Sequence, residues 1–240
     1  MNRWIGAPVL LGSLALGLAA CGGSSGSGSA SSGGSDNGEA AKSVSQIGHD
    51  VEAAMKGLKS FHISGSVTDS GQTIGLDLAV ENSGPGGGTM SINGSSFQLV
   101  VNGSKLYFKG DQAFWEKTGG VNASVANLFA GKWVTGVPST SDLQSLAQLT
   151  NINSFVSGLS SGSDSGPNGT KQSVTTFHGQ SALPIKSTDG TVYVATSGPP
   201  YLLGLQGGSQ GTLTFDQFNS ATAPAVPTGA VDFGDLSGGS

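Results

Sequence analysis

Between Phe61 and Lys109 the chain repeatedly alternates apolar and polar side chains, and only short turn sequences interrupt the pattern. The segment FHISGSVTD begins this stretch, with Phe61, Ile63 and Val67 on one side of the alternation. A period of two places successive side chains on opposite faces of a β-strand. Asn-Gly pairs at 93–94 and 102–103 separate further alternating runs, and this dipeptide accepts the positive φ of a two-residue hairpin turn. The stretch therefore predicts an antiparallel meander of about five strands.

The same alternation returns near residue 172 and continues to Phe218, with another two-residue turn expected at Asp189-Gly190. It predicts about five more strands. Apolar spacings of three and four residues predict helices at 39–60, 121–131, 141–149 and 153–159, while 83–88 and 160–169 are expected to be loops. A sheet of about ten antiparallel strands curls because of strand twist, and the helices are the available cover for its apolar face. We therefore predict an α+β fold with helices on the concave face of one curved antiparallel sheet.

The N-terminus carries the marks of export. A short basic segment that ends at Arg3 precedes an apolar run, which ends in Leu18-Ala19-Ala20-Cys21. This ending resembles the lipobox of bacterial lipoproteins, and Cys21 is the only cysteine of the chain, which excludes an internal disulfide. An ordinary secretory signal with an incidental cysteine is the alternative. We predict a signal peptide at 1–20, a lipidated cysteine with a Gly/Ser tether at 21–38, a folded domain at 39–236 and a tail at 237–240.

Composition limits the partners that such a protein can bind. Without Arg3 the chain has nine basic and fifteen acidic residues and no arginine, so it offers no basic patch for nucleic acid. Two acyl chains on a diacylglyceryl-modified Cys21 would hold it stably on a bilayer. We therefore expect a monomer anchored on the extracytoplasmic face of the cell membrane, with lipid as its partner.

Motifs of enzyme active sites are weak here. GLSSG at 158–162 and GGSQG at 207–211 match the G-x-S-x-G pattern, but neither lies in the strand–turn–helix context that a nucleophile elbow needs. His49, His62 and His178 are scattered without the spacing of metal ligands. We therefore expect no enzymatic activity, no metal site and no cofactor.

Six segments, taken in order, carry a family resemblance: the lipobox, MKGLKSFHISGSV (55–67), KLYFKGDQAFWEK (105–117), AGKWV (130–134), DGTVYVATSGPPYLLGL (189–205) and LTFDQFN (213–219). Together they resemble the LppX/LprG-type bacterial lipoproteins, which share a fold with the lipoprotein carriers LolA and LolB. The resemblance implies a half-open antiparallel β-barrel that holds acyl chains of lipids or lipoproteins in an apolar cavity and carries lipids or lipoproteins across the envelope. Carriers of the LolA type latch their lid with an arginine, which this chain lacks after Arg3.

The predicted cavity would be lined by alternating residues of the first meander and by two residues of the helical insert. They are Ile63, Val67, Leu76, Leu78, Val80, Phe97, Leu99, Val101, Leu106, Phe108, Leu128 and Phe129. An ordinary packed core requires the same alternation. A non-enzymatic scaffold or interaction lipoprotein with a filled core is therefore the alternative to a lipid-binding protein.

Overall fold

The computed structural model describes residues 36–234, apart from residues 70, 118, 137–149, 162–168 and 189. The side chains of residues 69 and 158–161 are also outside the description. Cys21, the predicted signal peptide, most of the tether and the predicted helix at 141–149 therefore lie outside the described residues, and these expectations remain predictions.

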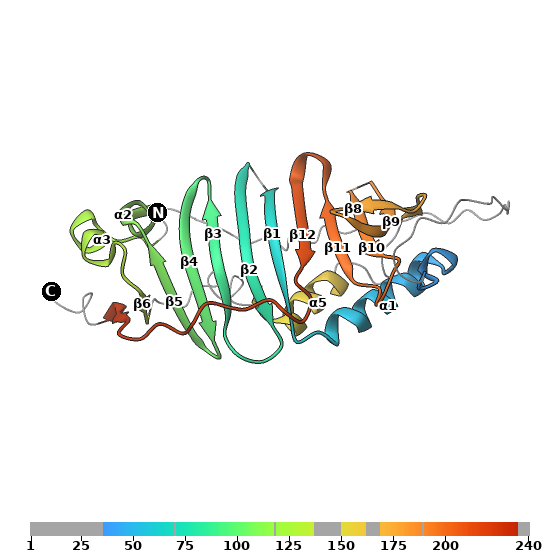
Figure 1. Cartoon of the computed structure of the whole chain (residues 1–240). Coiled ribbons are helices and arrows are strands. Elements are labelled where there is room, and N and C mark those ends of the chain that lie inside the picture. Colours follow the sequence, from blue (N-terminus) through green and yellow to red (C-terminus); the bar gives the residue numbers. More distant parts are fainter. Residues whose placement is uncertain are drawn as a thin grey trace.

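One open, curved sheet of thirteen strands forms the body of the molecule (Figure 1). Its path runs β13-β6-β5-β4-β3-β2-β1-β12-β11-β10-β9-β7, with β8 paired to β9, and every pair is antiparallel except β13 with β6. The strands are β1 (Ser60–Asp69), β2 (Gln72–Glu81), β3 (Gly86–Ile92), β4 (Ser95–Asn102), β5 (Lys105–Gly110), β6 (Val134–Thr135), β7 (Thr170–Lys171), β8 (Thr175–Phe177), β9 (Gln180–Lys186), β10 (Thr191–Ala195), β11 (Leu202–Gln206), β12 (Gly211–Asp216) and β13 (Val231–Asp232). The predicted fold class is confirmed. The strands beyond the expected ten include the two-residue β6, β7 and β13.

The hairpin turns follow the sequence signals only in part. Asn93 and Gly94 have φ values of 49° and 83° and form the turn that their dipeptide predicts. The second predicted turn is wrong by one residue, because Asn102 pairs with Lys105 and Gly103-Ser104 form the turn. The observed register places Val101 opposite Leu106, whereas the predicted turn would have placed it opposite Ser104.

Two other predicted connections also differ from the structure. The expected loop at 83–88 is shorter, because β3 already begins at Gly86. At the β9–β10 connection the Ser187 N–H donates to the Gly190 carbonyl at 2.7 Å, so Gly190 closes the turn rather than standing inside it. Asp189 itself lies outside the described residues.

The described helices are short and few. They are η1 (Glu39–Ala41), α1 (Val44–Lys56), α2 (Gln112–Lys117), α3 (Ala123–Phe129), α5 (Ile152–Ser161) and η2 (Gly208–Gln210). The predicted helix at 39–60 is shorter, because Ser43 caps α1 and β1 begins at Ser60. The sequence did not indicate α2, although the Asp111 side chain accepts a hydrogen bond from the Phe114 N–H at 2.7 Å, as a residue at a helix start does. None of the helices in the described ranges is long and apolar enough to span a bilayer.

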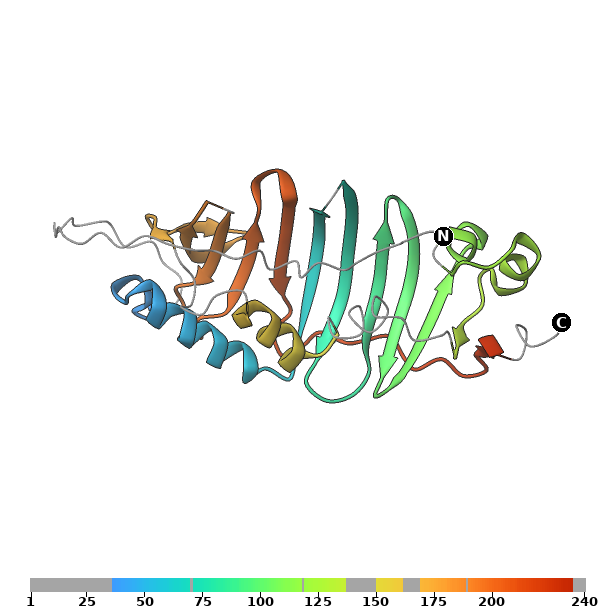
Figure 2. The same cartoon turned by 180° about the vertical axis from the view of Figure 1, so that it is seen from behind.

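All these helices except η2 lie against one face of the sheet, which we call the inner face. Figure 2 shows α1 and α5 in front of it. Ile47 of α1 packs on Leu183, Ile185 and Val194 of β9 and β10. In the centre the Phe155 ring of α5 lies 5.4 Å from that of Phe61.

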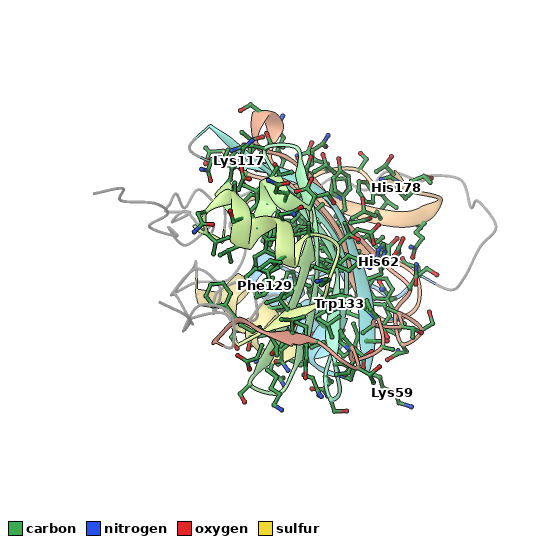
Figure 3. The ribbon with its side chains drawn as sticks, turned by 90° about the vertical axis from the view of Figure 1, so that its left-hand side faces the viewer. Lys59, His62, Lys117, Phe129, Trp133 and His178 are labelled. Atoms are coloured by element: carbon green, nitrogen blue, oxygen red, sulfur yellow. The ribbon has the colours of Figure 1, made fainter. Side chains whose placement is uncertain are left out.

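The opposite, outer face is covered along its lower end by the chain that follows β12. This C-terminal segment, residues 217–233, crosses β1 to β5 and ends where β13 pairs with β6 (Figure 1). Phe233 then stacks on Phe129 of α3 with 5.4 Å between ring centroids. Figure 3 shows that Phe129 and His62 lie on opposite sides of the sheet.

Candidate ligand-binding site

Most of the predicted cavity residues meet on the inner face. Cross-strand pairs such as Ile63 with Leu78 and Leu99 with Phe108 put them on one surface. Nine are buried in one apolar cluster and Leu106 packs against it; the nine are Ile63, Leu76, Leu78, Val80, Phe97, Leu99, Val101, Phe108 and Phe129. Val67 is half-buried outside this cluster, and Leu128 on α3 is 47% exposed. The structure thus brings ten of the twelve together and leaves two apart.

Aromatic rings from the helices fill much of the space above this surface. Phe155 lies 5.6 Å from Phe215, and Phe114 of α2 stacks on Phe97 with ring centroids 4.6 Å apart. Trp115 is buried next to Phe129 at 5.2 Å, and its indole N–H has no hydrogen-bond partner among the described residues. The inner face is therefore closed by side chains at its centre and at its α2–α3 end.

A hollow of about 580 Å³ opens at the edge of this layer, and we call it the rim hollow. It lies between the β2–β3 connection, the β4–β5 turn and the start of α5. Its described lining is Asn82, Ser83, Gly84, Gly86, Val101, Asn102, Gly103, Thr150, Asn151 and Ser154. The volume falls within the roughly 300–1,000 Å³ that is typical of ligand pockets.

The inner wall of the rim hollow belongs to the apolar layer. Val101 is 8% exposed, and it is part of the buried cluster as well as of the hollow's lining. A Cβ atom at Gly86 would overlap the carbonyl oxygen of Thr150, so glycine is what lets the chain before α5 approach β3 this closely. The hollow therefore reaches the edge of the buried cluster at Val101.

The mouth of the rim hollow is polar and uncharged. The Asn153 side chain donates to the Asn82 side chain at 3.1 Å, which ties α5 to the β2–β3 connection. Asn151 caps α5 by accepting from the Ser154 N–H at 3.1 Å. No charged side chain belongs to the described lining, so the geometry suits an apolar chain with an uncharged end near solvent.

Sequence reasoning found one residue of the rim hollow, Val101, and missed the others. Residues 82–86 and 150–154 lie far apart in the chain, and a single sequence holds no signal for such a contact. In the part of the chain that the structure describes, no three His, Cys, Asp or Glu side chains are grouped to hold a metal ion.

Comparisons with known proteins gave matches in structure alone. No family model and no curated protein matches the sequence. The chain is similar in structure to the lipoproteins LprF and LppX. LprF from Mycobacterium bovis is 15% identical, with a TM-score of 0.48, over 78% of this chain and 97% of LprF. LppX from Mycobacterium tuberculosis is 17% identical, with a TM-score of 0.43, over 75% of this chain and 96% of LppX.

Both similar structures belong to the lipoprotein family that segments of the sequence resemble. At these identities and TM-scores the likeness assigns no function to this chain.

Proposed function

We propose that this protein is a membrane-anchored, extracytoplasmic lipoprotein without enzymatic activity. It binds the acyl chains of a lipid between the inner face of its sheet and the covering helices, and carries them within the cell envelope. The supporting observation is the rim hollow, whose inner wall, Val101, is continuous with the buried apolar surface. An acyl chain that enters there would gain about 0.8 kcal/mol for each methylene that it buries.

Entry of a chain requires α5 to yield. In the described part this helix is held by Ile152, Phe155 and Val156, which are buried in the inner-face cluster, with the Phe155 ring against Phe61 and Phe215. The Asn153–Asn82 hydrogen bond and the hydrogen bond from the Glu81 N–H to the Thr150 carbonyl add to these contacts at its start. An acyl chain between α5 and the sheet would replace these ring contacts with contacts to its own methylenes. The exchange of one apolar contact for another costs little, so the layer can open without exposing the inner face to water.

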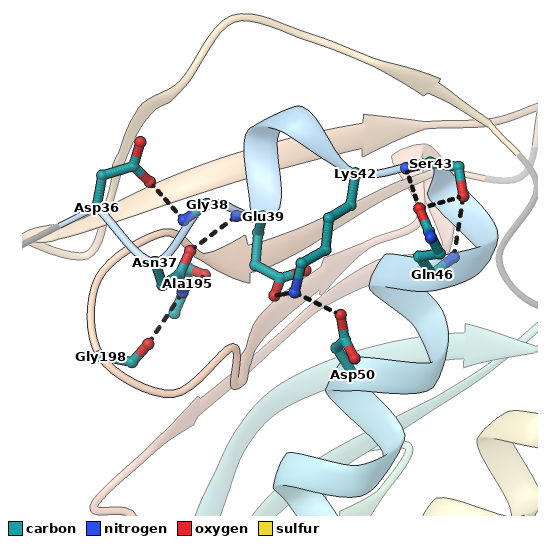
Figure 4. A network of polar contacts seen from close by, with 10 residues as sticks. All are labelled: Asp36, Asn37, Gly38, Glu39, Lys42, Ser43, Gln46, Asp50, Ala195 and Gly198. Atoms are coloured by element: carbon teal, nitrogen blue, oxygen red, sulfur yellow. Dashed lines mark hydrogen bonds and ion pairs between the residues drawn. The ribbon is translucent and has the colours of Figure 1, made fainter.

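The anchor would hold the domain by its β10–β11 end. Asp36 bridges to Ser197, and the Asn37 side chain donates to the carbonyls of Ala195 and Gly198 at 2.9 and 3.0 Å (Figure 4). The Gly/Ser segment between Cys21 and Asp36 would reach about 20 Å as a flexible coil. The domain would therefore stay near the bilayer with this end towards it.

The scaffold alternative has its own support in the structure. Leu78, Val80 and Leu99 have no exposed surface, as in a filled core. A packed inner face needs no ligand for its stability, so binding has to be measured directly.

The test uses the full lipidated chain, purified in detergent from a lipid-rich host. We expect extractable lipid by mass spectrometry and saturable uptake of a fluorescent fatty acid. Ser154→Trp should reduce both at least tenfold, because the indole fills the rim hollow from the exposed side of α5. Ser45→Trp, at an exposed position of α1, is the matched control and should bind as wild type does.

Two results would favour the scaffold instead. One is a wild-type chain that carries no lipid and takes up no fatty acid. The other is Ser154→Trp with unchanged uptake. A change at Val101 is less informative, because this side chain also belongs to the buried cluster and its replacement would disturb folding.

A further inference from the structure

A second hollow, of about 160 Å³, lies on the outer face, and we call it the outer hollow. Strands β1, β2 and β3 form its floor, and the C-terminal segment forms one wall. Its described lining is His62, Asp77, Ala79, Gly87, Gly88, Thr89, Gln217, Ala221, Thr222 and Pro224. The sheet separates this hollow from the inner face, so acyl-chain binding does not explain it.

One carboxylate of the outer hollow is held in place by its neighbours. His62 Nε2 lies 2.9 Å from Asp77 Oδ1, and His62 Nδ1 lies 2.8 Å from Asp216 Oδ1. Carboxylate oxygens only accept hydrogen bonds, so both ring nitrogens donate to these oxygens when the imidazole is protonated. Asp77 is 73% exposed, and its other oxygen remains available to a ligand.

Three neutral side chains in the outer hollow have free hydrogen-bonding groups. The hydroxyls of Thr89 and Thr222 and the amide of Gln217 have no hydrogen-bond partner within the described part of the chain. Each of these groups can donate as well as accept. Ala79, Ala221 and Pro224 add small apolar surfaces beside them.

Polar side chains continue from the outer hollow across the neighbouring strands in two rows. The first row, across five strands, is Thr214, Ser64, Asp77, Thr89 and Gln98. The second row, on the same strands, is Thr212, Ser66, Gly75, Ser91 and Ser96. Neighbouring members are separated by the strand spacing of about 4.8 Å. Seven of the ten members carry a hydroxyl and Asp77 is the only charged side chain among them, so the rows present a nearly neutral surface that is rich in hydroxyls.

We propose that the outer hollow and these two rows bind a neutral glycan strand, with one sugar ring in the hollow and the adjoining units along the rows. A sugar hydroxyl donates and accepts at once, and so do the threonine and glutamine groups that face it, while Asp77 accepts from two hydroxyls. Ala79, Ala221 and Pro224 suit the C–H face of a ring. The hollow has the volume of about five water molecules, enough for one ring rather than several.

The charges at the site select against anionic polymers. Asp77 and Asp216 bring two carboxylates, against one positive charge at most from His62. No lysine belongs to the described lining of the outer hollow. A polyanion would therefore meet net electrostatic repulsion. A neutral glycan would only displace bound water, and its hydroxyls would replace the hydrogen bonds of that water.

The experiment applies the full lipidated chain, in detergent, to an array of neutral and anionic oligosaccharides. We expect retention on at least one neutral glycan. Thr89→Trp should weaken it at least tenfold, because Thr89 is exposed and the indole would fill the hollow. Thr222→Trp would fill the hollow from the side of the C-terminal segment and should weaken glycan binding in the same way. It serves as the test if Thr89→Trp fails to fold. Ser124→Trp, exposed on α3, is the matched control and should bind as wild type.

Three outcomes would overturn the proposal: no neutral glycan retained, anionic glycans alone retained, or folded Thr89→Trp and Thr222→Trp chains that bind as wild type does. Lipid content is measured in the same samples. Thr89→Trp should keep the lipid, and Ser154→Trp should keep the glycan, so failure of one proposed site is distinguishable from failure of the other.

Discussion

His62 joins three adjacent strands through its side chain. It lies on β1 and contacts Asp77 of β2 and Asp216 of β12. Partial burial lowers the pKa of His62, but the hydrogen bonds to the two carboxylates outweigh this effect, so the pKa is raised above its ordinary value of 6.5. The protonated ring therefore stabilises the folded state more than the neutral ring does.

A pH dependence of stability follows from this residue. A raised folded-state pKa contributes stability that is complete below the unfolded pKa and is lost as the pH rises through the folded one. We expect the free energy of unfolding, measured in urea, to fall as the pH rises from about 6.5. His62→Gln should remove the part of this decrease in stability that comes from deprotonation of the imidazole. His178→Gln, at an exposed turn position, should retain it, and an equal effect of both changes would contradict the assignment.

Among the elements, α1 begins where its local sequence places it. Ser43 accepts from the Gln46 N–H at 3.3 Å, and the Gln46 side chain accepts from the Ser43 N–H at 3.0 Å. Lys42, just before the helix, pairs with Glu39 and Asp50 at 2.7 Å each (Figure 4). These contacts fix the start of α1 next to the end of the tether.

Ser43→Ala should lower the free energy of unfolding by about 1 kcal/mol, because it leaves the Gln46 N–H without its cap. Ser45→Ala, an exposed position inside the same helix, should be neutral or slightly stabilising, because alanine is the better helix former. Urea unfolding of both variants compares the two positions. Equal losses would show that the capping box does not stabilise this helix.

At the scale of the whole molecule, the N-terminal segment is attached to the last third of the chain. The Lys171 side chain donates to the carbonyls of Ala40 and Lys42 at 2.9 and 2.6 Å, and Glu39 is 1% exposed. A force on the tether would therefore act on the β7–β11 end of the sheet. The rim hollow, beside β2–β5, would remain free of the anchor.

Removal of the anchor tests this arrangement. Cys21→Ala should leave the signal peptide uncleaved by the lipoprotein peptidase and lower the share of protein in the detergent phase, because no acyl chains are attached. Intact mass and detergent partitioning measure both effects. Ser24→Ala, in the tether, is the control. Unchanged mass and partitioning of Cys21→Ala would reject lipidation at this residue.

Local chemistry in the sequence was sufficient for the longer strands and for α1, α3 and α5, but not for α2 or the two-residue strands β6, β7 and β13. The alternation from Phe61 onward predicted β1 to β5 because a period of two is a property of the strand itself. Asn93-Gly94 predicted its turn because positive φ is a local preference. The alternation also identified ten residues that share the buried cluster, but it could not distinguish a packed core from a cavity, since both need the same pattern.

Only the tertiary structure decided where the two hollows lie. The rim hollow exists because Gly86 lets the chain before α5 approach β3, and the outer hollow exists because the C-terminal segment crosses β1 to β3. The turn at Gly103-Ser104 likewise follows from pairing Val101 with Leu106 across two strands. Each of these features depends on contacts between distant parts of the chain. The energies of such contacts come from side chains that pack together only after the strands have paired, so no local stretch of sequence contains them.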